Sequence, residues 1–374
     1  MVLSITTARE SNAETVWWCK DRDLNVASIR LRGELVMRQL GALGHAVGWY
    51  EPGLSAAPRC LIVGKRSDAP TVDAVEQAKA AGSRIVIDFC DNTFMPSQAT
   101  ERGNRKVDNL RRLVSLADAI VAATQPLATI IRERCPDAPR PLVIGDLADD
   151  LSVVPASPLR QQLNRYKLWN ERRALQQVRE KGLARLVWFG NNGGRRGQSG
   201  YADLARLLPV LERLNRTIPL HLSVISNHRG KYLDMVRGTS LSNRYIGWDA
   251  WTFEDLLREH DVALIPAQVN AYSMCKTDNR VVTSLRAGVP VAADRIPSYE
   301  RFANVISLGD IESGLRDYLC NPELRARHVR RGQLQIAALT EPSRIVGRWE
   351  EALGLGHRVT AGIDYRRQPA FRRA

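Results

Sequence analysis

Short apolar runs alternate with amphipathic stretches along this chain, and the alternation limits the possible fold more than any other feature. In the first half, strands are predicted at 15–19, 45–51, 59–64, 83–89, 119–124 and 141–146. Helices are predicted between them at 28–44, 70–82, 107–118 and 126–135. Strands and helices taken in turn indicate a parallel sheet with helices on both faces.

One long basic helix, predicted at 158–182, interrupts the rhythm, which then restarts. Strands are predicted at 185–190, 219–226, 244–248, 262–267, 289–294 and 305–310. Helices are predicted at 200–217 and at 252–261, the latter with a capping pattern from Thr252 to Asp255, and the chain is mostly helical after 311. A chain of 374 residues exceeds one ordinary core. We therefore predict an α/β protein with two doubly wound, Rossmann-like domains, 1–157 and 183–354, which face a central cleft.

Composition limits the compartment in which the protein is expected and the partners that it is expected to bind. The six cysteines show no CxxC pair and no clustering with histidine, so no zinc site is predicted. The N-terminus lacks the basic start and apolar core of a signal peptide, which favours a cytoplasmic protein. A formal charge of +14 attracts phosphate-bearing partners, whether nucleic acid, anionic lipid or nucleotide.

Ligands of such folds bind at the carboxyl ends of the strands, so the loops there carry the candidate site residues. The glycine-rich loop 191–200 permits close backbone approach to an anion, and it contains Gly193, Gly194, Arg195 and Arg196. An ordinary flexible basic loop explains it equally well. Trp248, at the end of a short strand, is a candidate for stacking on a planar ring, although packing is the more common role of a tryptophan.

Residues 275–294, CKTDNRVVTSLRAGVPVAAD, place several polar residues where a helix begins: Lys276, Asp278, Asn279 and Arg280. Cations are mildly unfavourable at a helix N-terminus, because the helix dipole is already positive there. An anion held between Lys276 and Arg280 explains this placement. The alternative is that Lys276 pairs with Asp278 while Arg280 points to solvent.

The sequence VALIPAQ followed by NRVVTSLRAGVPVAA resembles the C-terminal domain of GT-B glycosyltransferases. The resemblance is to the retaining, type 4-like, nucleotide-sugar-dependent enzymes of bacterial polysaccharide and lipopolysaccharide synthesis, and it covers most of residues 15–310. It implies a nucleotide-sugar donor whose phosphates contact Asn279, Arg280, Lys276 and the loop from Gly193 to Arg196. It also implies that the base lies at Trp248, and that Lys and Arg supply the positive charge without a metal.

The chain departs from that family at two positions. Where many members have two glutamates eight positions apart, it has Cys275 and Thr283. The second glutamate usually holds the ribose, so three alternatives stay open: Asp278, Ser284 or Thr283 contacts the ribose, the donor differs, or activity is lost.

The first domain is expected to hold the acceptor. Its loop DRDLNVASIRLRG resembles a glycosyltransferase pattern and contributes Asn25, Ser28, Arg30 and Arg32 to the cleft, joined by Thr124 after the fifth strand. Asp88 and Asp91, in IDFCDNTF, are placed at the cleft edge as candidates for the base that deprotonates an acceptor hydroxyl. For Asp91, a role as a turn or cap residue has equal weight.

The expected acceptor is a glycan, lipid-linked or protein-attached. The basic helix 158–182, with Arg165, Lys167, Arg172 and Arg173, and the basic tail 355–374 are expected to bring the protein to an anionic membrane surface, at its inner face. Nucleic acid is not the expected partner, because no recognised nucleic-acid module is present. A catalytically silent partner subunit is the other alternative.

Overall fold

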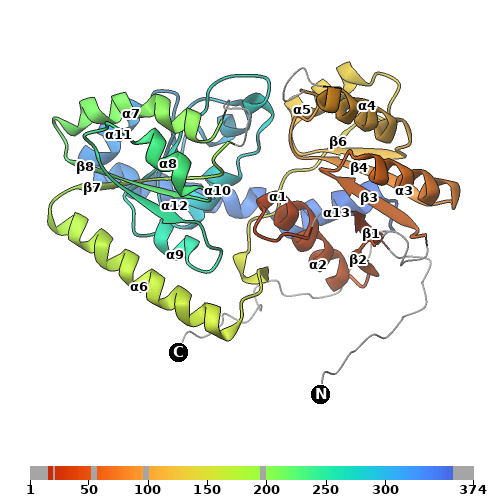
Figure 1. Ribbon diagram of the computed structural model, residues 1–374, viewed down its shortest axis with the longest axis horizontal. Coiled ribbons are helices and arrows are strands. Elements are labelled where there is room, and N and C mark those ends of the chain that lie inside the picture. The colour runs from red at the N-terminus through yellow and green to blue at the C-terminus, as the bar shows by residue number, and fades with distance from the viewer. Residues whose placement is uncertain (1–15, 20–21, 52–56, 96–100, 194–198, 357–374) are drawn as a thin grey trace.

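The computed structural model describes residues 16–19, 22–51, 57–95, 101–193 and 199–356. Two α/β units lie side by side, each with a six-stranded parallel sheet between helices (Figure 1). The predicted fold class is confirmed.

The N-terminal sheet has the strand order β2-β1-β3-β4-β5-β6, and every pair of neighbours is parallel. Its strands are β1 (Val16–Cys19), β2 (Val47–Trp49), β3 (Cys60–Gly64), β4 (Arg84–Phe89), β5 (Ala119–Ala122) and β6 (Leu142–Val143). Its helical segments are α1 (Ala27–Ile29), η1 (Arg30–Glu34), α2 (Leu35–Ala42), α3 (Ala69–Ala80), α4 (Glu101–Ser115) and α5 (Gln125–Arg134).

The C-terminal sheet has the order β12-β11-β10-β7-β8-β9 and is also parallel. Its strands are β7 (Ala184–Phe189), β8 (Leu220–Ser226), β9 (Ser242–Gly247), β10 (Val262–Ile265), β11 (Val291–Ala293) and β12 (Ser307–Leu308). The helices of this half are α6 (Pro158–Glu180), α7 (Tyr201–Asn215), α8 (Arg229–Met235), α9 (Phe253–Leu257), α10 (Asn279–Arg286), α11 (Ile311–Cys320), α12 (Pro322–Leu339) and α13 (Pro342–Leu353). Short helical turns are η2 (Leu151–Val153), η3 (Ser273–Cys275) and η4 (Pro297–Phe302).

Helices cover both faces of each sheet. Because successive residues of a strand point to opposite faces, both sets of strand side chains are buried. In β3, Ile62 joins the core under α2, whereas Leu61 joins the core under α3, α4 and α5. In β7, Val187 joins the core under α9, α10 and α12, and Trp188 the core under α7 and α11. This explains why the strands read as continuous apolar runs.

The last helix, α13, returns to the N-terminal sheet (Figure 1). Its buried face includes Ile345, Val346 and Trp349 in the core under α2, and Arg32 lies over the Trp349 ring at 5.4 Å. His45 and Glu350 form a buried pair at 2.8 Å between Nε2 and Oε1. The range 183–354 expected for the second domain is therefore too long, because its last helix belongs to the first.

Two local features differ from expectation. Helix α8 follows β8 although no helix was predicted there. Thr252 does not cap α9 with its side chain, because its backbone is already helical (φ −110°, ψ −15°) and its hydroxyl has no partner among the described residues.

The strand orders place the expected ligand site. The order in which the chain adds strands to the sheet reverses between β1 and β3 in one sheet and between β7 and β10 in the other. In open parallel sheets, the crevice at such a reversal is where ligands bind. The loops after β7 and β10 are the two that carry the glycine-rich segment and the start of α10.

Candidate functional site

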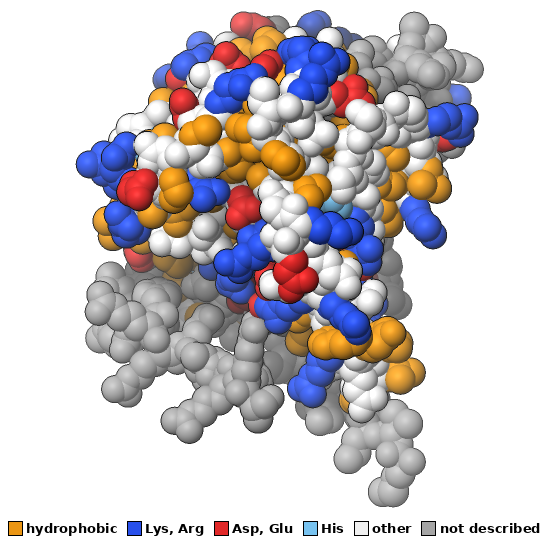
Figure 2. Space-filling view, turned by 90° about the vertical axis from the view of Figure 1, so that its left-hand side faces the viewer, with side chains coloured by type: hydrophobic (Ala, Val, Ile, Leu, Met, Phe, Trp, Pro, Cys, Tyr) orange, Lys and Arg blue, Asp and Glu red, His pale blue; other side chains and the backbone are white. Residues whose placement is uncertain are grey.

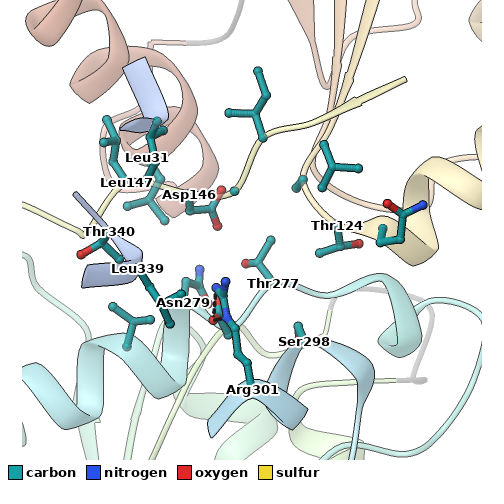
Figure 3. Close-up of a pocket in the computed structure, with 18 of the residues that line it drawn as sticks. Leu31, Thr124, Asp146, Leu147, Thr277, Asn279, Ser298, Arg301, Leu339 and Thr340 are labelled. Carbon is teal, nitrogen blue, oxygen red and sulfur yellow. Dashed lines mark hydrogen bonds and ion pairs between the residues drawn. The ribbon is translucent and has the colours of Figure 1, made fainter. Parts of the chain in front are cut away.

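A cavity of about 600 Å³ lies between the two units. Figure 3 shows Asp146 and Thr124 reaching it from the N-terminal unit, and Thr277 and Asn279 from the C-terminal unit. This volume lies within the range of small-molecule sites. Four of the predicted site residues line it: Thr124, Asp278, Asn279 and Thr283.

Helix α10 begins where the sequence indicated. Asp278 is its N-cap residue and Asn279 its first residue, so the free N–H groups of its first turn lie beside the cavity. The Asp278 side chain does not cap this helix; its carboxylate pairs with Arg301 of η4 instead. Burial raises the pKa of Asp278, with Arg301 opposing the shift. The Asp278 carboxylate, which was proposed to contact the ribose, is thus already paired with Arg301.

The side chain of Arg280 extends from the first turn of α10 toward the end of β7. A Cβ atom placed on Gly190 would lie 3.7 Å from its Nη1. Burial raises the pKa values of Tyr299 and Asp203, and the positive charge of Arg280 opposes both shifts. The Arg280 guanidinium therefore lies near the point where the strand order reverses, between β7 and β10, and does not simply point to solvent.

The loop after β7 closes tightly on itself at two glycines. Gly193 has φ +87°, and a Cβ there would lie 2.1 Å from the Ser199 carbonyl oxygen. Gly200, with φ +71°, leaves no room either, because a Cβ would lie 2.5 Å from the Asn191 oxygen. Only glycine fits both positions. Gly194, Arg195 and Arg196 lie outside the described residues.

A three-residue ionic cluster connects the two units beside the cavity. The Asp91 carboxylate is contacted by Lys276 Nζ at 2.7 Å and by Lys65 Nζ at 3.0 Å, and Lys276 also donates to the Tyr272 hydroxyl at 2.8 Å. Burial alone would raise the pKa of Asp91, but Lys276 and Lys65 outweigh it and lower that pKa to about 2. Lys276, expected on a donor phosphate, is thus paired with Asp91, the candidate base. It does not pair with Asp278.

Asp88 is not at the cleft edge, and that expectation is wrong. It lies within β4, and its buried carboxylate accepts from Arg32 at 2.7 Å between Oδ1 and Nη2. Arg32 also donates to the Ile144 carbonyl and to Asp146. Burial opposes the charge of Arg32, but Asp88 and Asp146 raise its pKa. Alternation along β4 turns Asp88 toward α2 and α13, where Arg32 lies.

Arg30 and Trp248 meet where the two units join. Arg30 is buried and forms a two-bond pair with Asp149, at 2.9 and 2.6 Å, and its guanidinium lies 5.6 Å from the Trp248 ring centre. Trp248 also packs on Phe253. Arg30 and Arg32, expected as acceptor contacts in the cleft, are therefore buried structural residues, and the half-buried Trp248 ring packs against Arg30 and Phe253.

The other first-domain candidates are placed as follows. Thr124 lines the cavity, where its hydroxyl donates to the Cys275 carbonyl at 3.1 Å and accepts from Leu127 N–H at the start of α5. Asn25 is exposed and bonds to Asp23. The Ser28 hydroxyl is buried with no partner among the described residues.

The two positions of the expected glutamates differ in environment. Thr283 is half-buried and lines the cavity. Cys275 is fully buried and packs into the core of the N-terminal unit. Burial raises the pKa of its thiol to about 11. Position 283 therefore can contact a ligand in the cavity, whereas position 275 is used for packing between the units.

Sequence reasoning missed several residues at this site. Lys65 completes the ionic cluster, and Arg301, Arg344 and Arg348 line the cavity from η4 and α13. Lys65 follows β3 directly, so the strand-end rule could have found it. The α13 arginines carried no signal, because nothing in the sequence says which sheet α13 joins.

The described residues contain neither a metal-binding cluster nor a helix able to span a membrane. No group of three His, Cys, Asp or Glu side chains is arranged to hold a metal ion. No helix among them combines the length and apolar character that crossing a membrane requires.

No family model and no curated protein sequence matches this chain, but solved structures are similar to it in fold. Anabaena HepE, solved in complex with UDP and glucose, is 13% identical with a TM-score of 0.61, over 91% of this chain and 99% of HepE. WaaG, a glycosyltransferase involved in lipopolysaccharide biosynthesis, is 14% identical with a TM-score of 0.59, over 90% and 98%. Trehalose-6-phosphate synthase OtsA is 12% identical with a TM-score of 0.54, over 82% and 74%. The chain thus has the GT-B fold of these glycosyltransferases.

Proposed function

We propose that this protein transfers a sugar from a nucleotide-sugar donor to a glycan, lipid-linked or protein-attached acceptor. The observation that carries the proposal is the position of Arg280. Its guanidinium lies beside Gly190 at the end of β7, and Arg280 follows Asp278 and Asn279, which begin α10 and line the 600 Å³ cavity. A diphosphate there would meet both a fixed cation and free N–H groups.

Glycosyl transfer breaks the bond between the anomeric carbon and the phosphate oxygen, and charge develops on the leaving diphosphate. Fixed positive groups that face this charge lower the barrier, because they need no reorganisation during the reaction. We propose that Arg280, Lys276 and the α10 N–H groups supply this stabilisation without a metal ion. Lys276 must then exchange Asp91 for phosphate when donor binds.

The GT-B fold of HepE, solved with UDP and glucose, supports the choice of donor class, as does the glycosyltransferase fold of WaaG. Nucleic acid is not the proposed partner. On the face shown in Figure 2, Lys and Arg side chains are mixed with Asp and Glu and form no continuous basic stripe. We place the protein in the cytoplasm, with access to an anionic membrane surface at its inner face.

A thermal-shift panel of UDP, GDP, CMP, dTDP and ADP, with their sugars, tests the donor site. A ligand at about 100 times its Kd stabilises the folded state by about 2.7 kcal/mol. At least one member should raise the melting temperature, and the rise should survive EDTA. If no nucleotide changes it, the donor-site proposal is wrong; if EDTA removes the change, metal independence is wrong.

A second candidate function is a nucleotide-binding subunit that does not transfer sugar. The buried Cys275 favours it, because no carboxylate can reach the cavity from position 275. Incubation with the stabilising nucleotide sugar separates the two functions. Release of free nucleoside diphosphate supports the enzyme, whereas binding without release, with or without mixed glycan and lipid acceptors, supports the silent subunit.

A further inference from the structure

Helix α6 contacts the protein along one face only. Asn164 and Leu175 are its buried residues, and Leu168 packs against the core of the C-terminal unit. On the same side, Lys167 donates to the Gly247 carbonyl at 2.7 Å and Arg172 pairs with Glu259 at 2.8 Å. These contacts fix the orientation of α6, which runs along the lower edge of that unit (Figure 1). They also show that two of the cations predicted to face a membrane face the protein.

The opposite face of α6 is apolar and exposed. Its side chains are Leu159, Leu163, Tyr166 and Trp169, which are 66%, 60%, 67% and 55% exposed. Their spacing of four, three and three residues places them on one side of the helix, along about 15 Å. Of the nine large hydrophobic side chains that are exposed among the described residues, these four share one helix. We call them the outer stripe of α6. Exposed apolar side chains gathered in this way mark an interaction site.

Positive charge borders the outer stripe. Arg165 and Arg173 have no acidic partner among the described residues, and the Arg173 guanidinium lies 5.6 Å from the Trp169 ring centre. Tyr166 and Trp169 are ring neighbours, with centres 6.1 Å apart. Tyr and Trp place their apolar bodies and polar edges at the boundary between headgroups and acyl chains. Arginines beside them suit anionic headgroups.

We propose that the outer stripe of α6 docks the protein on an anionic lipid bilayer, with its four apolar side chains in the interface and Arg165 and Arg173 on the headgroup phosphates. Charge selects this occupant over a second copy of the chain. The chain carries +14, and α6 has six basic residues and two acidic ones, so two copies would repel each other at this face. The surface is separate from the cavity, so nucleotide binding and lipid binding are tested independently.

Vesicle flotation with the full chain tests the proposal. The probes are phosphatidylcholine vesicles with and without about one third phosphatidylglycerol, at low and high salt. We expect binding to the anionic vesicles alone. L163S/W169S should reduce the partition coefficient about tenfold or more, because apolar insertion supplies part of the affinity. R165E/R173E should reduce it at least about tenfold by reversing two charges.

Matched controls lie on another helix. L334S removes an apolar side chain that is 75% exposed on α12, and R330E reverses an exposed cation there. Both should bind vesicles as the parent chain does. All variants should keep the parent melting temperature and any nucleotide shift, which shows that the fold and the cavity are intact.

Insertion is measured separately, by quenching of tryptophan fluorescence with brominated anionic lipid. The W169F variant should still bind but lose the quenched component. Two results would overturn the proposal. One is vesicle binding that depends on charge but not on the outer stripe. The other is absence of vesicle binding while sedimentation shows a dimer that L163S/W169S dissociates, because the stripe would then contact a second copy.

Discussion

Replacement of Asp91 by Asn tests whether this carboxylate is a link between the two units or a catalytic base. In the structure it lies between Lys276 and Lys65, at 2.7 and 3.0 Å, with 16% of its side chain exposed. The Asp91→Asn variant retains the shape of the side chain but removes the charge that holds the two lysines. As a link, Asp91 should contribute to stability; as a base, it should control the pH dependence of transfer.

The magnitude follows from the pKa. Lys276 and Lys65 lower it from 3.8 to about 2 against the effect of burial, and such a shift corresponds to about 2 kcal/mol of stability. Because the folded-state pKa is the lower one, this contribution is complete above the unfolded-state value near 4. It is lost as the pH falls through about 2, with roughly half remaining near pH 3.

The assay is urea unfolding of the parent chain, Asp91→Asn, Lys276→Met and the double variant, at several pH values from 7 down to 3. At pH 7 the coupling energy between positions 91 and 276 should be about 1–3 kcal/mol, and it should shrink toward acid. Mutation of Asp91 alone should cost at least about 2 kcal/mol, because it also leaves two lysines facing each other.

A coupling energy within about 0.3 kcal/mol of zero at pH 7 would contradict the link. So would a coupling that stays constant down to pH 3. If transfer is detected, a pKa near 2 makes Asp91 a weak proton acceptor at neutral pH. Loss of transfer in Asp91→Asn with unchanged unfolding would restore the catalytic role.

Three further predictions concern α10 and the segment just before it. Arg280→Ala should weaken nucleoside diphosphate binding by about 10- to 100-fold in calorimetry, since it removes a charge-assisted contact; Arg316→Ala, on the surface of α11, is the control, and equal binding in both would move the phosphate site elsewhere. Thr283→Glu should strengthen binding of the same nucleotide about tenfold without loss of stability, because position 283 faces the cavity, and an unchanged Kd would remove the ribose from this position. Cys275→Glu should instead lower the unfolding free energy by at least about 3 kcal/mol, because its carboxylate would be buried among apolar groups, and urea unfolding at parental stability would contradict this packing.

The alternation of strands and helices was sufficient to predict both sheets. Each predicted strand is present, because a parallel sheet buries both faces and so demands apolar runs that the sequence shows directly. The destination of α13 could not be predicted. Its apolar face requires a partner, but Trp349 would satisfy burial on either sheet, and its contact with Arg32 depends on tertiary structure.

The site was predicted less well than the fold, for a physical reason. The strand-end rule brought Thr124 and Asn279 to one cavity, which Thr283, chosen from the family resemblance, also lines. It says nothing of which side chains are already paired there. Asp88 and Arg32 were assigned separate roles, yet they neutralise each other in the core, and such pairing depends on which helix covers which face of the sheet.

The departure at Cys275 has a structural explanation in the contacts of the segment 271–276. Asn92 donates to the Ala271 carbonyl at 3.1 Å, Thr124 donates to the Cys275 carbonyl, and Lys276 pairs with Asp91. Two consecutive loops of the N-terminal unit, after β4 and after β5, therefore contact one short segment of the C-terminal unit. A glutamate at 275 would place a charge in the apolar centre of this contact. This segment thus holds the two units together, and of positions 275 and 283 only Thr283 lines the cavity.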